Sequence, residues 1–401
     1  MKNNKLLPIA SLKIVSSEET KEIADIIREA VLKKYSISLE DTEDAGCPSI
    51  TLAIDSSLEF KSYSIDVSCE KESVTLIAGN LETLYYAAQR LIRSHMGETP
   101  YLEDLHIDTK VMITSDPSIL CHDGKYYLCS FVCTYHGGNA NNGYEIYVSD
   151  NMYDWGEPIH AFNAQECTNP AFDGISHYWA PEIWEYKGKF YIFATYFSEK
   201  SGHRGCAIFR CDKPDGKYEL ITNGHLTPSD WDCIDNTLYV DENGDPWMVF
   251  VHEWTSMPDH IGSMCACRLT DDLTAFEGEI TTLFYANDAP WNPKNNVTDG
   301  PFVHRFESGK LAMIWSGWIS GEYCIGVAYS DNGILGPWVQ QEECVFARGI
   351  GDYRYGRDGG HGFMFRDADG RLMITFHGPI KQKNVYCIEV DTTGDVIKLK
   401  N

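Results

Sequence analysis

Five copies of one short segment dominate the sequence after residue 110. Each copy begins at a turn glycine and continues as a run of apolar and aromatic residues. The copies read DGKYYLCSF at Gly124, KGKFYIFATY at Gly188, NGDPWMVFVH at Gly244, SGKLAMIWSGW at Gly309 and DGRLMITFHG at Gly370. Successive glycines are 64, 56, 65 and 61 residues apart, a period that suits a four-stranded unit with long loops and is too long for a helical repeat. The repeats therefore predict the blades of a β-propeller.

A further strand-like stretch follows each glycine and ends on an aspartate. These stretches end 21 to 27 residues after the glycine, at Asp150, Asp212, Asp271, Asp331 and Asp391. A hairpin followed by another strand, with Gly, Asn and Asp at the breaks, is typical of a blade. We therefore expect a mainly β chain whose residues 105–401 form a five-bladed β-propeller.

Polar side chains precede each hairpin at a similar distance. Counting back six to ten residues from the five glycines gives Asp116, Glu182, Asp235, Asp299 and His361. The first strand of a propeller blade is the innermost one, so we expect these residues at equivalent places around a central pit. Carboxylates gathered in a pit are costly unless they are paired, metal-bound or used in chemistry.

The first 104 residues have a different pattern. Ser16 and Glu19 have the spacing of a capping box, and apolar residues then recur on one helical face. Three strand-like runs and a second amphipathic helix follow, at residues 49–54, 62–67, 73–78 and 81–93. This order predicts a small α/β sandwich domain over residues 1–104.

Composition narrows the set of partners. The chain has 401 residues and a formal net charge of −26, and an acidic surface gains nothing from a nucleic acid or an anionic membrane. We therefore expect a neutral substrate and neither of those partners, and the oligomeric state stays open. The apolar patch at residues 6–10 is broken by Pro8 and too short for a secretory signal, and no stretch reaches about 18 apolar residues. These features predict a cytoplasmic protein.

Three inward carboxylates can cleave a glycosidic bond. One accepts a proton from water, one donates a proton to the leaving oxygen, and a third adjusts the pKa of the donor. A separation of about 6.5 to 9.5 Å between base and acid leaves room for the water and inverts the anomeric configuration. Turn formation is the other reading of Asp116-Pro117 and of Asp299-Gly300-Pro301.

The repeats resemble glycoside hydrolase family 43, a family of five-bladed arabinofuranosidases, xylosidases and arabinanases. The matching segments are SDPSILCHDGKYYL, WAPEIWEYKGKFYIFATY, CIDNTLYVDENGDPWMVF, TDGPFVHRFESGKLAMIWS and GGHGFMFRDADGRLMITFH, within residues 105–390. By this resemblance Asp116 is the general base and Asp235 the aspartate that adjusts the pKa of the acid. His361 resembles the axial histidine that helps to hold a calcium or sodium ion in many members. Hydrolysis itself requires no cofactor.

The resemblance also implies an inverting hydrolase that removes α-L-arabinofuranosyl or β-D-xylosyl units from oligosaccharides. The run KSYSIDVSCEKESVTLIAGNLETLYYAAQRLIR resembles the accessory α/β domain of family 20 β-hexosaminidases and family 67 α-glucuronidases. That domain precedes the catalytic domain in those families.

The general acid is where the chain departs from the family. The family has glutamate in an EGP motif, whereas this chain has the shorter Asp299 before Gly300 and Pro301. Either Asp299 is the acid, or Glu253 in VHEW has the role, or the chain is a catalytically silent sugar-binding propeller. Other candidates for substrate contact are Trp179 as a stacking surface, Glu182 as an orienting group and His252 at a strand end.

Overall fold

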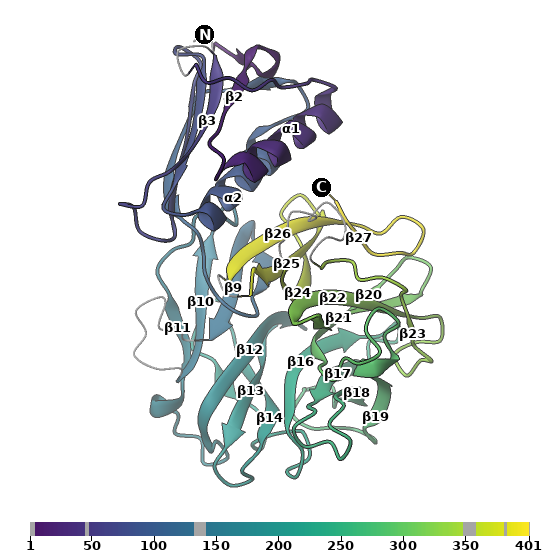
Figure 1. Ribbon diagram of the computed structural model, residues 1–401. Coiled ribbons are helices and arrows are strands. Elements are labelled where there is room, and N and C mark those ends of the chain that lie inside the picture. The colour runs from purple at the N-terminus through teal and green to yellow at the C-terminus, as the bar shows by residue number, and fades with distance from the viewer. Residues whose placement is uncertain (1–4, 45–47, 132–141, 348–357, 381–382, 401) are drawn as a thin grey trace. The chain divides into compact units, whose positions relative to one another are not determined.

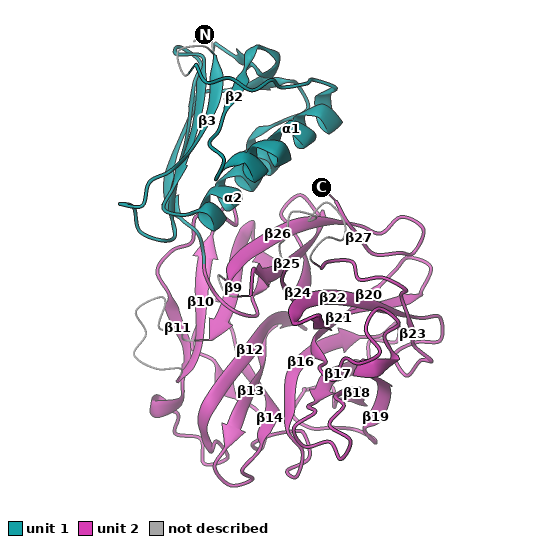
Figure 2. Ribbon diagram, in the orientation of Figure 1, with its two compact units in different colours: residues 1–112 teal, residues 113–401 magenta. Residues whose placement is uncertain are grey.

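The computed structural model describes residues 5–44, 48–131, 142–347, 358–380 and 383–400. The chain forms two compact units, residues 1–112 and residues 113–401 (Figure 2). No helix among the described residues is long and apolar enough to cross a membrane.

Unit 1 is a two-layer α/β sandwich, as predicted. Its sheet has the order β2–β3–β5–β4–β7, with β2, β3 and β5 parallel and the other two strands antiparallel to their neighbours. The strands are β2 (Lys13–Val15), β3 (Ser49–Ile54), β4 (Ser62–Ser68), β5 (Ser73–Ala78) and β7 (Leu105–Lys110), and a separate pair consists of β1 (Leu7–Pro8) and β6 (Tyr101–Leu102). Helices α1 (Lys21–Tyr35) and α2 (Leu81–Arg90) lie on one face of the sheet (Figure 1).

Two boundaries in this unit differ from the expectation. Strand β7 pairs with β4, so the unit ends at residue 112 rather than 104. The predicted capping box is also wrong, because α1 begins at Lys21. Before it, Ser17 and Thr20 form a closed turn in which the Ser17 amide donates to Thr20 Oγ1 over 2.9 Å.

Unit 2 is a five-bladed β-propeller, which confirms the predicted fold. Each blade is a four-stranded antiparallel sheet made of consecutive strands. The blades are β8 (Ser118–His122), β9 (Lys125–Phe131), β10 (Gly143–Ser149) and β11 (Ile159–Asn163); β12 (Gly174–Tyr186), β13 (Lys189–Ser198), β14 (Arg204–Cys211) and β15 (Glu219–Leu220); β16 (Cys233–Val240), β17 (Pro246–His252), β18 (Ser263–Arg268) and β19 (Thr281–Tyr285); β20 (Asp299–Arg305), β21 (Leu311–Ile319), β22 (Glu322–Ser330) and β23 (Val339–Gln340); and β24 (Gly360–Arg366), β25 (Leu372–Gly378), β26 (Asn384–Asp391) and β27 (Lys398–Leu399).

The first strands of neighbouring blades contact one another, and the contact of β24 with β8 closes the ring. The segment before the first blade strengthens this closure. Ile113 bridges to Asn384 at the start of β26, and the Thr114 amide donates to the Lys383 carbonyl over 2.9 Å. The last blade is thereby tied to the chain that leads into the first.

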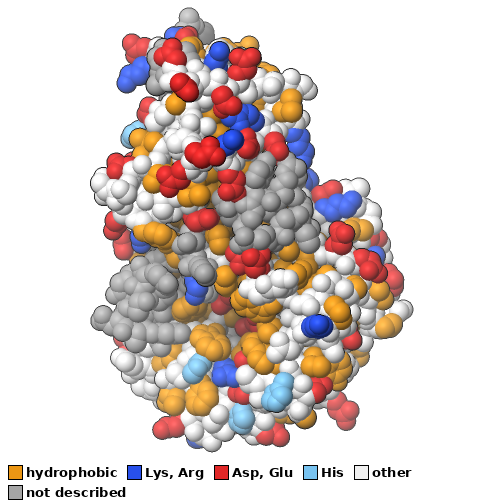
Figure 3. All heavy atoms as spheres, in the orientation of Figure 1, with side chains coloured by type: hydrophobic (Ala, Val, Ile, Leu, Met, Phe, Trp, Pro, Cys, Tyr) orange, Lys and Arg blue, Asp and Glu red, His pale blue; other side chains and the backbone are white. Residues whose placement is uncertain are grey.

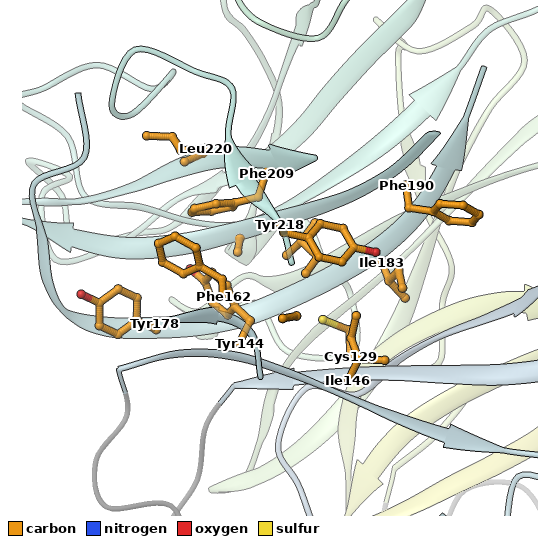
Figure 4. Close-up of a cluster of buried hydrophobic side chains, with 14 of the residues drawn as sticks. Cys129, Tyr144, Ile146, Phe162, Tyr178, Ile183, Phe190, Phe209, Tyr218 and Leu220 are labelled. Carbon is orange, nitrogen blue, oxygen red and sulfur yellow. The ribbon is translucent and has the colours of Figure 1, made fainter. Parts of the chain in front are cut away.

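Apolar side chains fill the spaces between blades. Figure 4 shows the cluster between the first two blades, where the buried ring of Tyr144 meets Phe209 with centroids 5.5 Å apart and Tyr178 with centroids 6.1 Å apart. Burying one large apolar side chain stabilises a fold by about 1.5 to 3 kcal/mol. Packing of this kind holds the inner strands, and therefore their side chains, in fixed positions.

Candidate active site

A left-handed backbone conformation marks the same place in every blade. The residues are Asp116 (φ 52°), Ala180 (φ 39°), Asp235 (φ 56°), Gly300 (φ 47°) and His361 (φ 56°), each in or just before an inner strand. Such angles strain a non-glycine residue and cluster at functional sites. Three of the five positions carry a polar side chain.

The expectation of equivalent positions is therefore wrong for two residues. Glu182 lies two positions after Ala180, and Asp299 lies one position before Gly300. Inner strands β12, β16, β20 and β24 all have a register shift at this point, so the bulge itself does not set these two residues apart. The left-handed residues lie eight or nine residues before the hairpin glycine in every blade, whereas Glu182 lies six and Asp299 ten residues before it.

Hydrogen bonds from the preceding blade hold three of the strained residues. The backbone amides of Asp235, His361 and Asp116 donate to Thr195 Oγ1 (3.0 Å), Ser316 Oγ (2.7 Å) and His377 Nδ1 (3.1 Å) respectively. These acceptors lie in the last four residues of the second strands β13, β21 and β25. Sequence reasoning missed them, although each lies seven residues after the turn glycine of its repeat.

Side chains from four blades meet at one point. His361 Nδ1 lies 3.2 Å from Asp116 Oδ1 and 3.8 Å from Asp235 Oδ2. The Gly300 amide donates to Asp235 Oδ2 over 3.0 Å, which brings the neighbouring Asp299 into the group. Asp116, Asp235, Asp299 and His361 thus form one cluster, the carboxylate cluster. Figure 3 shows the surface of unit 2 with a hollow edged by hydrophobic and histidine side chains.

Burial gives the aspartates different proton affinities. Burial raises the pKa of Asp235 to about 6, with His361 opposing this shift and Asp116 adding to it. The pKa of Asp299 lies well above its ordinary value because of burial first, and then because of the charges of Asp235 and Asp116. At neutral pH, Asp235 is therefore mostly ionised, while burial and the neighbouring charges favour the protonated form of Asp299.

His377 is a neutral neighbour of the carboxylate cluster. Burial lowers the pKa of His377 to about 4. Its Nδ1 accepts the Asp116 amide and lies 3.5 Å from Asp116 Oδ1. The proton of the neutral ring is therefore on Nε2. His377 fixes the backbone of Asp116 without adding a positive charge.

An aromatic plug lies further along the inner strands. Trp184, Phe302 and Phe363 contact one another, with ring centroids 5.5 Å (Trp184–Phe302), 5.3 Å (Trp184–Phe363) and 5.0 Å (Phe302–Phe363) apart. Trp184 Nε1 donates to Glu182 Oε2 over 3.0 Å, and burial raises the pKa of Glu182 to about 8. Glu182 is therefore a neutral acid between the carboxylate cluster and the plug. A hollow of about 350 Å³ is lined by Trp184, Phe302 and residues near the other ends of the inner strands, and by none of the clustered aspartates.

The remaining candidates lie outside the carboxylate cluster. Glu253 is buried, and its Oε2 accepts a hydrogen bond from Arg204 Nε over 2.7 Å. The guanidinium of Arg204 lies 5.7 Å from the ring centre of the half-buried Trp179. His252 stacks on Trp231 with centroids 3.9 Å apart and contacts Ser256. Trp179 and His252 have no contact with the four clustered residues among the contacts described.

A protein cage for a metal ion is absent from the described part of the chain. No group of three or more His, Cys, Asp and Glu side chains there could hold an ion, and His361 Nδ1 faces two carboxylates. The residues present do not fit a directly ligated calcium or sodium ion, and no step below depends on one. An axial ion held mainly by water beside His361 remains a prediction.

The fold and the carboxylate cluster define a propeller glycosidase. Residues 111–394 match the model of "Glycosyl hydrolases family 43", and the chain belongs to this family. It is therefore a glycoside hydrolase. The model confirms the family resemblance of the repeats, whereas the likeness of unit 1 to accessory domains stays a prediction.

Similar proteins are named as an arabinase, a xylanase and an arabinofuranosidase. An endo-arabinase from Bacteroides thetaiotaomicron is 35% identical, with a TM-score of 0.61 over 71% of this chain and 96% of that one. An endo-1,4-beta-xylanase from the same organism has a TM-score of 0.60 at 23% identity, over 73% of this chain and 95% of that one, and shows the fold alone. The extracellular exo-alpha-(1->5)-L-arabinofuranosidase ArbA of Cellvibrio japonicus is 27% identical over 153 residues, which cover 35% of this chain and 42% of ArbA.

Proposed function

We propose that the chain is an inverting hydrolase that releases α-L-arabinofuranosyl units from oligosaccharides. The observation that carries the proposal is the carboxylate cluster, in which Asp116 and Asp235 both lie within 4 Å of His361 Nδ1. The Gly300 amide, next to Asp299, donates to Asp235 Oδ2, and burial raises the pKa of Asp299. An ionised acceptor and a protonated donor in one site are the two groups that hydrolysis of an acetal needs.

Each aspartate has one role in this mechanism. Asp116 takes a proton from the water that attacks the anomeric carbon. Asp299 gives its proton to the glycosidic oxygen as the bond from carbon to oxygen breaks, so the leaving sugar departs as an alcohol. Asp235 carries the negative charge that keeps the proton on Asp299 until the leaving oxygen needs it.

The related proteins favour arabinose over xylose. Two relatives above 25% identity, the endo-arabinase and ArbA, are named for arabinase or arabinofuranosidase activity. Xylosyl units are the alternative substrate. The predicted cytoplasmic location would limit the enzyme to short imported chains, whereas ArbA is named as extracellular. Activity on polymeric arabinan would favour an extracellular enzyme over a cytoplasmic one.

The glycosidase assignment is tested with a panel of nitrophenyl furanosides and pyranosides and with linear arabino-oligosaccharides. We expect turnover of the arabinofuranosides, with a β-configured first product detected by proton NMR. Retention of configuration would overturn inversion. Tight sugar binding without turnover on any substrate would instead support the silent sugar-binding propeller.

A further inference from the structure

Tyr323 is a buried polar group of the carboxylate cluster that this mechanism does not use. Its hydroxyl donates to Asp299 Oδ2 over 3.1 Å, and the residue is 3% exposed. Tyr323 belongs to β22, the third strand of its blade, whereas Asp299 begins β20, the first strand. The phenol therefore reaches across the intervening strand β21 to meet the carboxyl group.

Neighbouring residues fix the ring of Tyr323. The ring of Trp318 packs against it with centroids 5.1 Å apart, and the ring of His377 lies 5.7 Å away. On another side, a Cβ atom added to Gly360 would lie 2.5 Å from the Tyr323 ring, which is closer than any real contact. Only glycine fits beside the ring, so the hydroxyl has a defined position.

We propose that Tyr323 is a positioning residue for the general acid: by donating to Oδ2 of Asp299, it leaves Oδ1 as the oxygen that carries the catalytic proton. This inference rests on the proposed role of Asp299. A carboxyl oxygen that accepts a hydrogen bond serves as the carbonyl oxygen, and the proton resides on the other oxygen. Tyr323 thus favours the form of Asp299 in which Oδ1, rather than Oδ2, carries the proton.

The same hydrogen bond stabilises the group after proton transfer. The proton leaves Oδ1 for the glycosidic oxygen, and the electrons of the broken O–H bond stay on Asp299. Tyr323 keeps its own proton, and its hydrogen bond strengthens because the acceptor is now an ion. A contact that is stronger after the transfer than before it lowers the barrier.

The short side chain of Asp299 explains why such a residue is needed here. Aspartate is one methylene shorter than the glutamate of the family motif, so its carboxyl group delivers the proton from further back. A small misplacement of a reacting group can cost about 100-fold in rate. The hydrogen bond from the fixed Tyr323 hydroxyl restricts rotation of the Asp299 carboxyl group, which would otherwise add to this misplacement.

The test compares Tyr323→Phe with wild type on two substrates. An arabino-oligosaccharide needs a proton on its leaving oxygen, whereas a dinitrophenyl arabinofuranoside does not. We expect kcat/KM to fall about 10- to 100-fold on the oligosaccharide and less than about 3-fold on the aryl substrate. The alkaline limb of the pH profile should move to higher pH, because the lost donor no longer favours the ionised form of Asp299. The charged groups around Asp299, namely Asp235, Asp116 and Glu253, are unchanged in the variant.

Tyr239→Phe is the matched control. Tyr239 is also buried, its hydroxyl has no hydrogen-bond partner among the described residues, and the charged groups near it, Arg305, Glu242 and Asp241, lie outside the carboxylate cluster. This variant should hydrolyse both substrates with the kcat/KM of the wild type. Equal losses on both substrates in Tyr323→Phe, with the alkaline limb unmoved and the melting temperature preserved, would overturn the positioning role.

Asp299→Asn separates this inference from the function on which it rests. If that variant still hydrolyses the oligosaccharide at the wild-type rate, Asp299 is not the acid and the proposed mechanism fails. If it loses the oligosaccharide activity while Tyr323→Phe keeps it, the acid stands and only the role of Tyr323 is refuted.

Discussion

Three side chains of one type acquire different properties in this site because their surroundings differ. Asp116 keeps 21% of its side chain exposed, whereas Asp235 is 7% exposed and has a pKa near 6. Burial, and then the charges of the other two, raise the pKa of Asp299. The proposed division into acceptor, charge and donor thus follows from position on the inner strands rather than from residue type.

Asp116→Asn should slow both kinds of substrate alike. Activation of water is needed whatever the leaving group is, so we expect kcat to fall about 10²- to 10⁴-fold on the aryl arabinofuranoside and on the oligosaccharide. Steady-state kinetics on the two substrates measures this, and arabinose binding by calorimetry shows that the site is intact. A loss confined to the oligosaccharide would assign Asp116 to the leaving group instead.

Glu253→Gln should behave as a loss of structure rather than of an acid. The Glu253 carboxylate is paired with Arg204 over 2.7 Å, and removing one partner of a buried ion pair costs about 3 to 5 kcal/mol of stability. We expect a lower midpoint of urea unfolding and equal effects on the two substrates. A selective loss of oligosaccharide hydrolysis, larger than that of Asp299→Asn, would give Glu253 the role of acid.

The four residues of the carboxylate cluster were easier to predict than the residues that hold them in place. Asp116, Asp235, Asp299 and His361 were selected from their place in the repeats, and the structure brings them together. Tyr323 was not selected, because its hydroxyl reaches Asp299 from another strand and no local pattern announces such a contact.

At the scale of single elements, the sequence predicts strands better than register. Strands β3 and β5 of unit 1 have their predicted bounds, since their residues largely alternate between apolar and polar. The comparison of positions failed for Glu182 and Asp299 because equivalent residues lie eight or nine residues before the hairpin glycine, and a range of six to ten residues admits their neighbours. Hydrogen bonds between blades were missed because they join residues distant in the sequence.

Thr195→Val tests the hydrogen bonds between blades. The change keeps the shape of the side chain but leaves the buried amide of Asp235 without its acceptor. An unpaired buried amide costs about 1 to 3 kcal/mol, so we expect the free energy of unfolding in urea to fall by that amount. Thr375→Val is the control, because the buried Thr375 hydroxyl has no partner among the described residues. Equal destabilisation of both variants would refute the argument.

For the whole molecule, burial of a neutral acid makes stability depend on pH. The pKa of Glu182 is about 8 in the folded chain, against an ordinary value of 4.5. Between these values the folded state holds a proton that the unfolded chain has lost, so the free energy of unfolding falls as pH rises. This contribution is fully present below about pH 4.5 and is lost by about pH 8.

Glu182→Gln should therefore stabilise the protein at alkaline pH. The amide oxygen of the variant side chain can still accept the hydrogen bond from Trp184 Nε1. Because an amide does not titrate in this range, the pH-dependent contribution of the Glu182 carboxyl group to stability disappears. We expect the advantage over wild type to grow between pH 5 and pH 8 by on the order of a few kcal/mol, measured by urea unfolding at several pH values. Glu279→Gln, at an exposed position without an ion pair among the described residues, should follow the wild-type curve. Parallel curves for Glu182→Gln and wild type would contradict the prediction.

The division into two units was predictable from the change of pattern along the chain, although its exact position was not. Residues 105–110 lack any mark that assigns them to the earlier unit, and only their pairing with β4 does so. The propeller itself was predictable because a repeated sequence requires a repeated structure.

The aromatic plug has a consequence for turnover. Three rings in mutual contact lie beyond Glu182 along the inner strands, beside the hollow of about 350 Å³ and away from the clustered aspartates. In the proposed mechanism, the product and the proton that returns to Asp299 would therefore use the opposite end of the propeller. Recovery of the acid would then follow departure of the sugar.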